Sequence, residues 1–218
     1  MPKVLKIALL VLMCTTLATV ALLTLERRRA GAGFDPLMPD DHVRTLSIPE
    51  FTLTAQDSTA LTRDTLKGRV TIADFIFTHC PFICPTLTGK MKELSIQLGD
   101  TPVRFLSVSV DPMNDTPARL TEYAKENNAD LARWTFATGE MATVKSIVTG
   151  GLKFDLEEDA EQPIKLPDGS FMNNIRHPSW LALIGPDAQV LGIYLASVPE
   201  DMQALEQRAR AAAARLKK

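Results

Sequence analysis

Strands and helices alternate through the middle of this chain of 218 residues, and that order restricts the folds it can adopt. The predicted elements are, in chain order, a strand at 69–77, a helix from 85 to about 98, a strand at 103–110, a helix opening at 116–117 and a strand at 134–138. The first strand is apolar at nearly every position, which is typical of the centre of a sheet. We therefore expect an α/β domain with parallel pairing in its middle.

Shorter elements flank this centre on both sides. Alternating segments at 51–54 and 59–62 predict an N-terminal hairpin, and segments at 181–184 and 190–194 predict a second one through a turn at 185–188. A short helix is expected at 140–148 and a last helix from about 200 to 216. Residues 150–174 interrupt the pattern, and their acidic stretch and Pro167-Asp168-Gly169 turn predict an exposed insertion, either a loop or a hairpin.

The N-terminal segment differs in kind, because residues 7–25 form an apolar run of 19 positions without a charge. Such a run is long enough to cross a bilayer. We expect an uncleaved membrane anchor at 1–29, a linker at 30–47 and a folded domain at 48–218 of a bacterial membrane protein. A cleaved signal peptide is the alternative, although the run is longer than usual for one. Cys14 lies inside the run, where we expect it to pack or to face lipid.

The overall composition argues against one class of partner. The formal net charge is −2, and the chain contains neither an interleaved basic and aromatic patch nor a phosphate-binding glycine loop. We expect no nucleic-acid partner.

Cys80 and Cys84 are the only cysteines outside the N-terminal run, and they lie between the first central strand and the helix after it. Pro81 and Pro85 disfavour helical geometry at the residue before each of them, so both sulfurs should lie on a constrained loop. Backbone N–H groups at the start of the helix favour a thiolate. The pair is therefore expected to be reactive, either binding a soft metal ion or closing to a disulfide. Two buried small residues that merely lie close together are the alternative.

A third ligand would make the metal interpretation stronger, since two thiolates and an imidazole form a trigonal site that accepts copper in either oxidation state. The three histidines of the chain are His42 in the expected linker, His79 beside Cys80, and His177 before the second hairpin. For a lone histidine, a surface or packing role is the more common one. On the residues alone the third ligand stays open.

Three motifs in order along the chain extend this interpretation. They are Phe77-Thr78-His79-Cys80-Pro81-Phe82-Ile83-Cys84-Pro85, then Val110-Asp111-Pro112 with Asp115-Thr116-Pro117, then His177 ahead of Leu181-Ala182-Leu183-Ile184-Gly185-Pro186. Over about residues 48–214 the chain resembles the Sco (SenC) family of copper-handling proteins. The resemblance implies a thioredoxin-like fold with an N-terminal hairpin and an inserted loop or hairpin, here preceded by one transmembrane helix.

The resemblance also implies a site and a function. Cys80, Cys84 and His177 would bind one copper ion, and Asp111 would lie near the site, although a turn or cap role for Asp111 is equally expected. Members of the family assist assembly of the dinuclear copper centre of cytochrome c oxidase, as copper chaperones or as thiol reductants. The implied partners are the copper-receiving oxidase subunit and other copper chaperones or thiol reductants. The implied location is the bacterial inner membrane, with the soluble domain facing the periplasm.

Two other functions use the same cysteines. A thiol-disulfide oxidoreductase would reduce the cysteines of a copper-receiving protein, and a thiol peroxidase would attack peroxide through Cys80. Three residues between the cysteines disfavour an ordinary thioredoxin, which has two. A pure oxidoreductase has no need of His177, so that residue discriminates a copper chaperone, which is not an enzyme, from a reductase.

Overall fold

The computed structural model describes residues 12–13, 15–17, 19–20, 34–166, 168–177 and 179–216. Most of the expected membrane anchor, Cys14 included, lies outside these residues. Within the described part of the chain, no helix is both long enough and apolar enough to span a bilayer. Residues from Pro36 to Lys218 form one compact unit.

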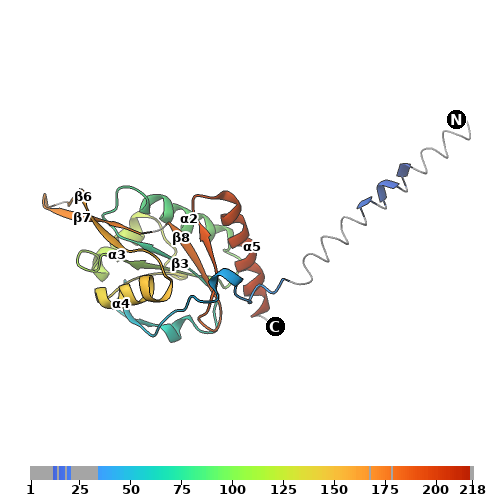
Figure 1. The fold of residues 1–218 in the computed structure, drawn as a ribbon, viewed down its shortest axis with the longest axis horizontal. Helices are drawn as coiled ribbons and strands as arrows, with labels where there is room; N and C mark the ends of the chain where they lie inside the picture. The colour runs from blue at the N-terminus through green and yellow to red at the C-terminus, as the bar shows by residue number, and fades with distance from the viewer. Residues whose placement is uncertain are drawn as a thin grey trace, which may run out of the picture. The chain divides into compact units, whose positions relative to one another are not determined.

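A seven-stranded sheet forms the middle of this unit, with the strand order β2-β1-β5-β4-β3-β8-β9 (Figure 1). The strands are β1 (Thr52–Ala55), β2 (Ala60–Thr62), β3 (Thr71–Ile76), β4 (Arg104–Ser109), β5 (Trp134–Thr138), β8 (Trp180–Ile184) and β9 (Val190–Leu195). The three central strands β3, β4 and β5 pair in parallel, and the outer pairings are antiparallel. Every residue of β3 is buried, as its continuous apolar sequence predicts.

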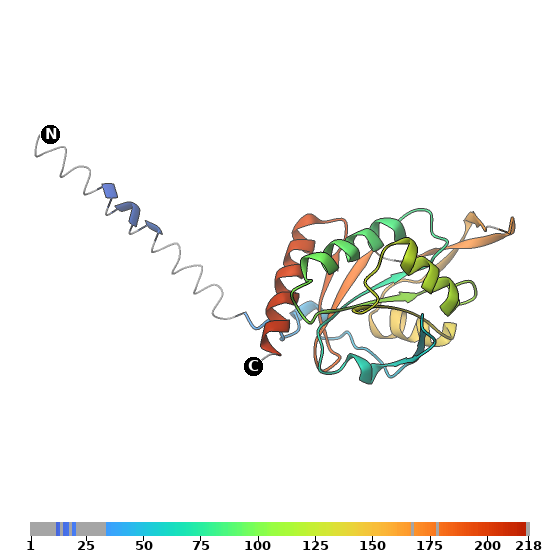
Figure 2. The ribbon, with the colours of Figure 1, turned by 180° about the vertical axis from the view of Figure 1, so that it is seen from behind.

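Helices connect and cover the strands. They are α2 (Cys84–Gln97), α3 (Pro117–Glu126), α4 (Met141–Lys145) and α5 (Pro199–Arg215), with the short 3-10 turns η1 (Asp41–Val43) and η2 (Arg63–Leu66). In the view from behind, α2 runs beside α5 (Figure 2), and the two helices line a common groove. Both hairpins, the parallel centre and the final helix agree with the predicted thioredoxin-like outline.

The insertion forms a hairpin of its own. Strands β6 (Glu157–Lys165) and β7 (Phe171–Arg176) pair antiparallel in a separate two-stranded sheet, which extends away from the main sheet (Figure 1). Most of its side chains are exposed. Of the two predicted forms of the insertion, the hairpin is therefore confirmed.

The helix predicted at 140–148 differs from the structure, because α4 continues as a π-helical turn, η3 (Ser146–Gly151). At the end of this turn the Gly151 carbonyl accepts a hydrogen bond from the Ser47 N–H at 3.1 Å. A Cβ atom on Gly151 would lie only 2.3 Å from the Ser47 carbonyl oxygen. The turn thus brings two backbones together where only glycine fits.

Residues 36–47 fall in the expected linker, yet they pack against the folded unit: Val43 is buried in the core, and Arg208 binds the first part of the segment. The buried guanidinium of Arg208 in α5 donates to the Asp40 carboxylate at 2.6 Å, to the Met38 carbonyl at 2.6 Å and to the Pro36 carbonyl at 3.3 Å. It also donates to the Tyr194 hydroxyl at 3.2 Å. The folded unit therefore begins nearer to residue 36 than to residue 48, because a distant arginine satisfies these carbonyls.

Arg208→Ala should lower the free energy of unfolding by about 3 kcal/mol, because it leaves the Asp40 carboxylate and two carbonyls without their buried donor. Arg210→Ala is the matched control on the same helix. Its ion pair with Asp100 is exposed on both sides, so its loss should lower the free energy of unfolding far less than the loss of Arg208. Urea denaturation of both variants measures the difference, and equal losses would contradict the assigned role of Arg208.

Candidate functional site

The predicted site residues come together at one end of β3. Cys80 follows the carboxyl end of β3, Cys84 begins α2, and His177 lies on the short connection from β7 to β8. Because β8 pairs antiparallel to β3, the start of β8 lies beside the end of β3. The sheet topology therefore places His177 against a cysteine pair that is more than ninety residues away in sequence.

His177 contacts the second cysteine directly. Its Nε2 atom lies 3.4 Å from the Cys84 Sγ atom. The half-buried imidazole also packs edge-on against Phe77, with ring centroids 5.9 Å apart. His177 is thus held by contacts on two sides, whereas His42 is exposed on η1.

The two cysteines are reduced thiols in nonequivalent surroundings. A hydrogen bond from the Cys84 thiol is the main cause that lowers the pKa of Cys80 to about 6, and the backbone N–H groups of Cys84, Phe82 and Ile83 lower it further. The same thiol interaction, together with burial, raises the pKa of Cys84 strongly. At neutral pH the pair therefore holds one proton, on Cys84, and Cys80 is the thiolate.

The predicted stabilisation of a thiolate by helix-start amides thus acts on Cys80 in the loop, not on Cys84 in the helix. Cys84 is 1% exposed and Cys80 is 8% exposed. The loop 80–84 folds back so that its own N–H groups face the first sulfur. This division of roles needs the turn geometry, which the spacing of the two cysteines did not reveal.

Asp111 lies in a polar cluster beside the loop of the two cysteines. Ligand atoms of His79, Asp111 and Asp115 lie within 4.8 Å of one another. Asp111 accepts two hydrogen bonds from the Asn114 side chain, at 2.8 and 3.1 Å, and its carbonyl accepts from the N–H of Asp115. Asp111 therefore acts at least as a turn residue, which was one of the two roles predicted for it.

Asp115 ties this cluster to the loop that carries the cysteines. It is fully buried and accepts hydrogen bonds from the Thr78 hydroxyl at 2.6 Å and the Ser109 hydroxyl at 2.6 Å. Its carboxylate also accepts from the Thr78 N–H. Burial is the main cause that raises the pKa of Asp115. This anchoring role has no local sequence signal, because it depends on a contact across 37 positions.

Asp74 is a second acidic residue that the sequence analysis did not select. It is the one charged residue in β3, it is fully buried, and neither carboxylate oxygen has a hydrogen bond of standard geometry. Burial raises its pKa to about 7, although the nearby Ser107 hydroxyl partly offsets that effect. A single aspartate in an apolar strand was the available sequence signal.

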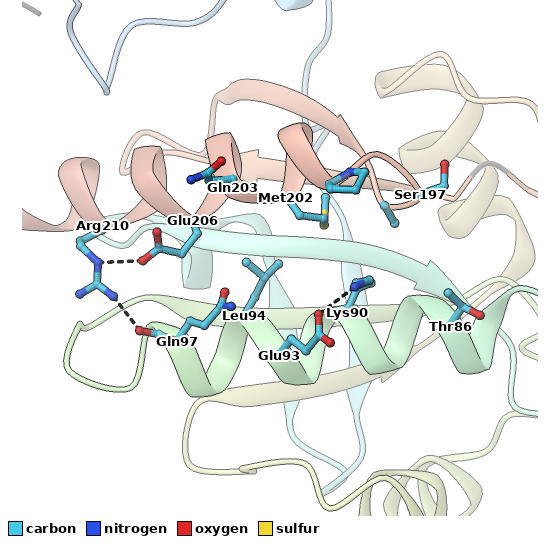
Figure 3. Close-up of a pocket in the computed structure, with 12 residues that line it drawn as sticks. Thr86, Lys90, Glu93, Leu94, Gln97, Ser197, Met202, Gln203, Glu206 and Arg210 are labelled. Atoms are coloured by element: carbon cyan, nitrogen blue, oxygen red, sulfur yellow. Dashed lines mark hydrogen bonds and ion pairs between the residues drawn. The ribbon is translucent and has the colours of Figure 1, made fainter. Parts of the chain in front are cut away.

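A groove that does not include the cysteines lies elsewhere on the folded unit. It has a volume of about 770 Å³ and runs between α2 and α5. Figure 3 shows the ion pair of Lys90 with Glu93 along α2 and that of Arg210 with Glu206 along α5. A smaller pocket of about 350 Å³ is lined by His177, Arg176 and Trp180 among others. Solvent therefore reaches the site from the side of His177.

The comparisons with known proteins agree with these features. The SCO1/SenC family model matches residues 40–212. The SCO1 protein homolog of Bacillus subtilis (strain 168) is 35% identical over 153 residues, which are 67% of this chain and 72% of the relative.

Solved structures are similar over most of the folded unit. The structure of BsSco, a member of the Sco family of cytochrome c oxidase assembly proteins in which a disulfide switch was identified, is 29% identical with a TM-score of 0.62. The alignment covers 80% of this chain and 98% of that chain. The structure of Bradyrhizobium japonicum ScoI with copper bound is 25% identical with a TM-score of 0.59, covering 78% of this chain and 98% of that chain.

Fold and site together define a thioredoxin-like protein with two cysteines between its first central strand and the helix that follows, the second of them at the start of that helix. More particularly, the chain belongs to the SCO1/SenC family. The family predicted from the motifs is thereby confirmed.

Cys84→Ala should raise the pKa of Cys80 from about 6 towards its ordinary value, because the variant removes the thiol that donates to the Cys80 thiolate. The rate of alkylation of Cys80 by iodoacetamide as a function of pH measures this pKa. Ile83→Ala, which keeps the backbone donors and Cys84, is the control and should leave the profile in place. An unshifted profile in Cys84→Ala would contradict the assigned hydrogen bond.

Asp74→Asn should stabilise the fold in a pH-dependent manner. The folded-state pKa of Asp74, about 7, lies above the value near 4 of an unfolded aspartate, so the wild type loses stability as pH rises from about 4 to 7. Asparagine carries no such charge, so its advantage should grow over the same interval and reach roughly 3–4 kcal/mol above pH 7. Urea denaturation at pH 4, 6 and 8 measures it, and an advantage independent of pH would exclude a buried ionisation.

Proposed function

We propose that this protein is a membrane-anchored copper chaperone that binds one copper ion through Cys80, Cys84 and His177. It assists assembly of the dinuclear copper centre of cytochrome c oxidase. The observation that carries the proposal is the distance of 3.4 Å between the His177 Nε2 atom and the Cys84 Sγ atom. A thiol pair built only for disulfide exchange does not require an imidazole at that position.

The chemistry of the three side chains suits copper. Thiolate sulfur is a soft ligand that favours copper(I), and the addition of imidazole makes a trigonal set that also accepts copper(II). Both thiols must lose their protons to bind the ion. The low pKa of Cys80 supplies one ligand at neutral pH, whereas Cys84 must still release its proton.

The comparisons support the same cargo. The similar structure from Bradyrhizobium japonicum is described with copper bound, and BsSco belongs to a family of cytochrome c oxidase assembly proteins. A copper-receiving oxidase subunit is accordingly the proposed acceptor, and other copper chaperones or thiol reductants are the proposed further partners. Asp111, which lies with His79 and Asp115 beside the cysteine loop, is proposed to contact a partner or to support the ligands.

The proposed location is the bacterial inner membrane, with the folded unit in the periplasm. The uncharged run at 7–25 has the length of a membrane-spanning helix, and basic residues flank it on both sides. A periplasmic position would also suit a cysteine pair that cycles between thiol and disulfide, because that compartment is oxidising.

A second function, reduction of disulfides in a copper-receiving protein, is supported by the Cys80 thiolate. A thiolate at neutral pH is the attacking species in thiol-disulfide exchange. Copper binding and disulfide formation use the same two sulfurs, so one excludes the other at any moment. The protein could therefore perform both functions, in alternation.

Copper binding by variants tests the first function. The full-length protein, reduced and purified in a mild detergent, is mixed with copper(I) and with copper(II) separately and examined by metal analysis and absorption spectroscopy. The wild type should bind one copper, and Cys80→Ser or Cys84→Ser should bind none. His177→Ala should weaken binding at least about 100-fold, because even the loss of a residue that only orients a ligand typically costs 10- to 100-fold.

His42→Ala is the matched control, since His42 is exposed on η1. It should bind copper as the wild type does. His177→Ala should still form the Cys80–Cys84 disulfide, because it removes neither sulfur. Binding of one copper ion by Cys80→Ser would refute the proposed ligand set. If the wild type binds no copper, the reductase function becomes the better supported of the two.

A further inference from the structure

The hairpin of β6 and β7 carries an acidic surface that the fold does not explain. Residues 157–176 contain five acidic and two basic side chains, a formal net charge of −3, whereas the whole chain carries −2, so the other residues together carry +1. Because β6 and β7 pair only with each other and most of their side chains are exposed, these acids contribute little to the core. Charge of one sign on an exposed projection favours the recognition of an oppositely charged partner.

Ion pairs within the hairpin neutralise only part of this charge. Arg176 pairs with Glu157 at 2.7 Å and with Asp159 at 3.8 Å. The other base, Lys165, offsets one further charge at most. Three exposed acids form no ion pair with any described residue, and they are Glu158, Glu161 and Asp168.

Two contacts place the hairpin beside the loop of the two cysteines. The Met172 Sδ atom in β7 lies 3.8 Å from the side-chain nitrogen of Asn114 in the turn after β4. Asp168, in the turn between β6 and β7, interacts electrostatically with His79, the residue before Cys80. Figure 1 shows the hairpin projecting beyond the main sheet. A partner that approaches the cysteines therefore meets the negative field of the hairpin.

Exposed apolar side chains border the same loop. Phe82 and Ile83, between the two cysteines, are 60% and 36% exposed, and Met113 in the turn after β4 is 85% exposed. The two loops are neighbours, because ligand atoms of His79 and Asp111 lie within 4.8 Å of each other. Protein interfaces combine an apolar centre with a polar rim. The apolar side chains thus indicate a protein partner, and the hairpin indicates the sign of that partner's charge.

We propose that the acidic hairpin, residues 157–176, docks a protein partner whose surface around its own cysteines is rich in lysine and arginine. The proposal rests on the function proposed above, in that this partner either receives copper or is reduced by Cys80. Complementary charge raises the rate of encounter by about 10- to 1,000-fold at low salt and orients the partner. The partner's cysteines would then meet Cys80 across the exposed Phe82, Ile83 and Met113.

Charged disulfide probes test the acidic hairpin in the reduced, metal-free full-length protein in a nonionic detergent. Three synthetic peptides of equal length each contain one cysteine flanked by four lysines, four glutamates or four glutamines, and each is used as its symmetrical disulfide. The Cys80 thiolate attacks one peptide sulfur, the S–S bond breaks, one peptide thiolate leaves, and the other peptide forms a mixed disulfide with Cys80. Acid quenching and mass spectrometry give the initial rates. Each rate is divided by that of the same probe with dithiothreitol, which removes the probe's intrinsic reactivity.

The wild type should react at least about 10-fold faster with the lysine probe than with the glutamate probe in 20 mM sodium chloride. In 300 mM sodium chloride this ratio should fall below about threefold, because salt screens exposed charges. Glu158→Gln, Glu161→Gln and Asp168→Asn combined should bring the ratio below about threefold at low salt and keep the rate with the glutamine probe within about twofold. A ratio near one in the wild type, or an unchanged ratio in this triple variant, overturns the proposal.

The matched control neutralises three exposed acids that precede the parallel strands β3, β4 and β5, at the opposite end of the sheet from the cysteines. Asp64→Asn, Asp100→Asn and Asp130→Asn combined change the net charge by the same amount, yet should keep the ratio within about twofold of the wild type. Equal losses in the two triple variants would overturn the proposal, because overall charge would then set the rates. Glu161→Lys changes one exposed side chain and replaces the first triple variant if that variant does not fold.

Binding without reaction separates the acidic hairpin from the function on which the proposal rests. The three peptides are made with serine in place of cysteine and with a fluorophore, and anisotropy gives their dissociation constants. If no disulfide probe reacts, the reductase function fails, while tighter binding of the lysine peptide that is lost in the hairpin triple variant still supports docking. Equal binding of the three peptides overturns docking. Copper(I) binding of the wild type is measured in parallel, and its absence would refute the chaperone function alone.

Discussion

The antiparallel pairing of β8 with β3 is the constraint on which the site depends. β3 ends at the loop of the two cysteines, and β8 begins just after His177. The register pairs Ala73 with Ala182, so any shift of β8 along β3 would move the imidazole away from the Cys84 sulfur. Because every residue of β3 is buried, the apolar core fixes this register before any metal is present.

Burial also determines how the two sulfurs differ. Cys80 faces backbone donors and the thiol of Cys84, so its charge is stabilised. Cys84 is enclosed on the interior side, where Asp74 also lies, and therefore keeps its proton. A thiolate next to a thiol is the arrangement that thiol-disulfide exchange requires, because the thiolate is the attacking species. The same state is one proton short of the two thiolates that a copper ion would need.

The sequence predicted the fold well because its signals are local or periodic. The apolar run of β3, the Pro85 that follows Cys84 at the start of α2, and the alternation in β8 and β9 need no knowledge of distant contacts. The family motifs also identified Cys80, Cys84 and His177, which the structure brings together. These local patterns explain why the element order is confirmed.

The predictions were incomplete where a role depends on contacts between distant residues. Asp115 holds the cysteine loop through hydrogen bonds to Thr78, and Arg208 forms an ion pair with Asp40, which lies 168 positions away in the sequence. Neither contact has a periodic signal. The short helix expected at 140–148 likewise continues as a π-helical turn, which accompanies the approach of Ser47 to Gly151.

His177 is connected to the rest of the fold differently from the two cysteines. On one side the residue is joined to β8 in the core sheet, and on the other to β7 in the exposed hairpin, whose two strands pair only with each other. The cysteines, by contrast, are held by β3, by α2 and by the hydrogen bonds of Asp115 to Thr78. The imidazole is thus joined to both sheets, whereas the two cysteines belong to the end of β3 and the start of α2.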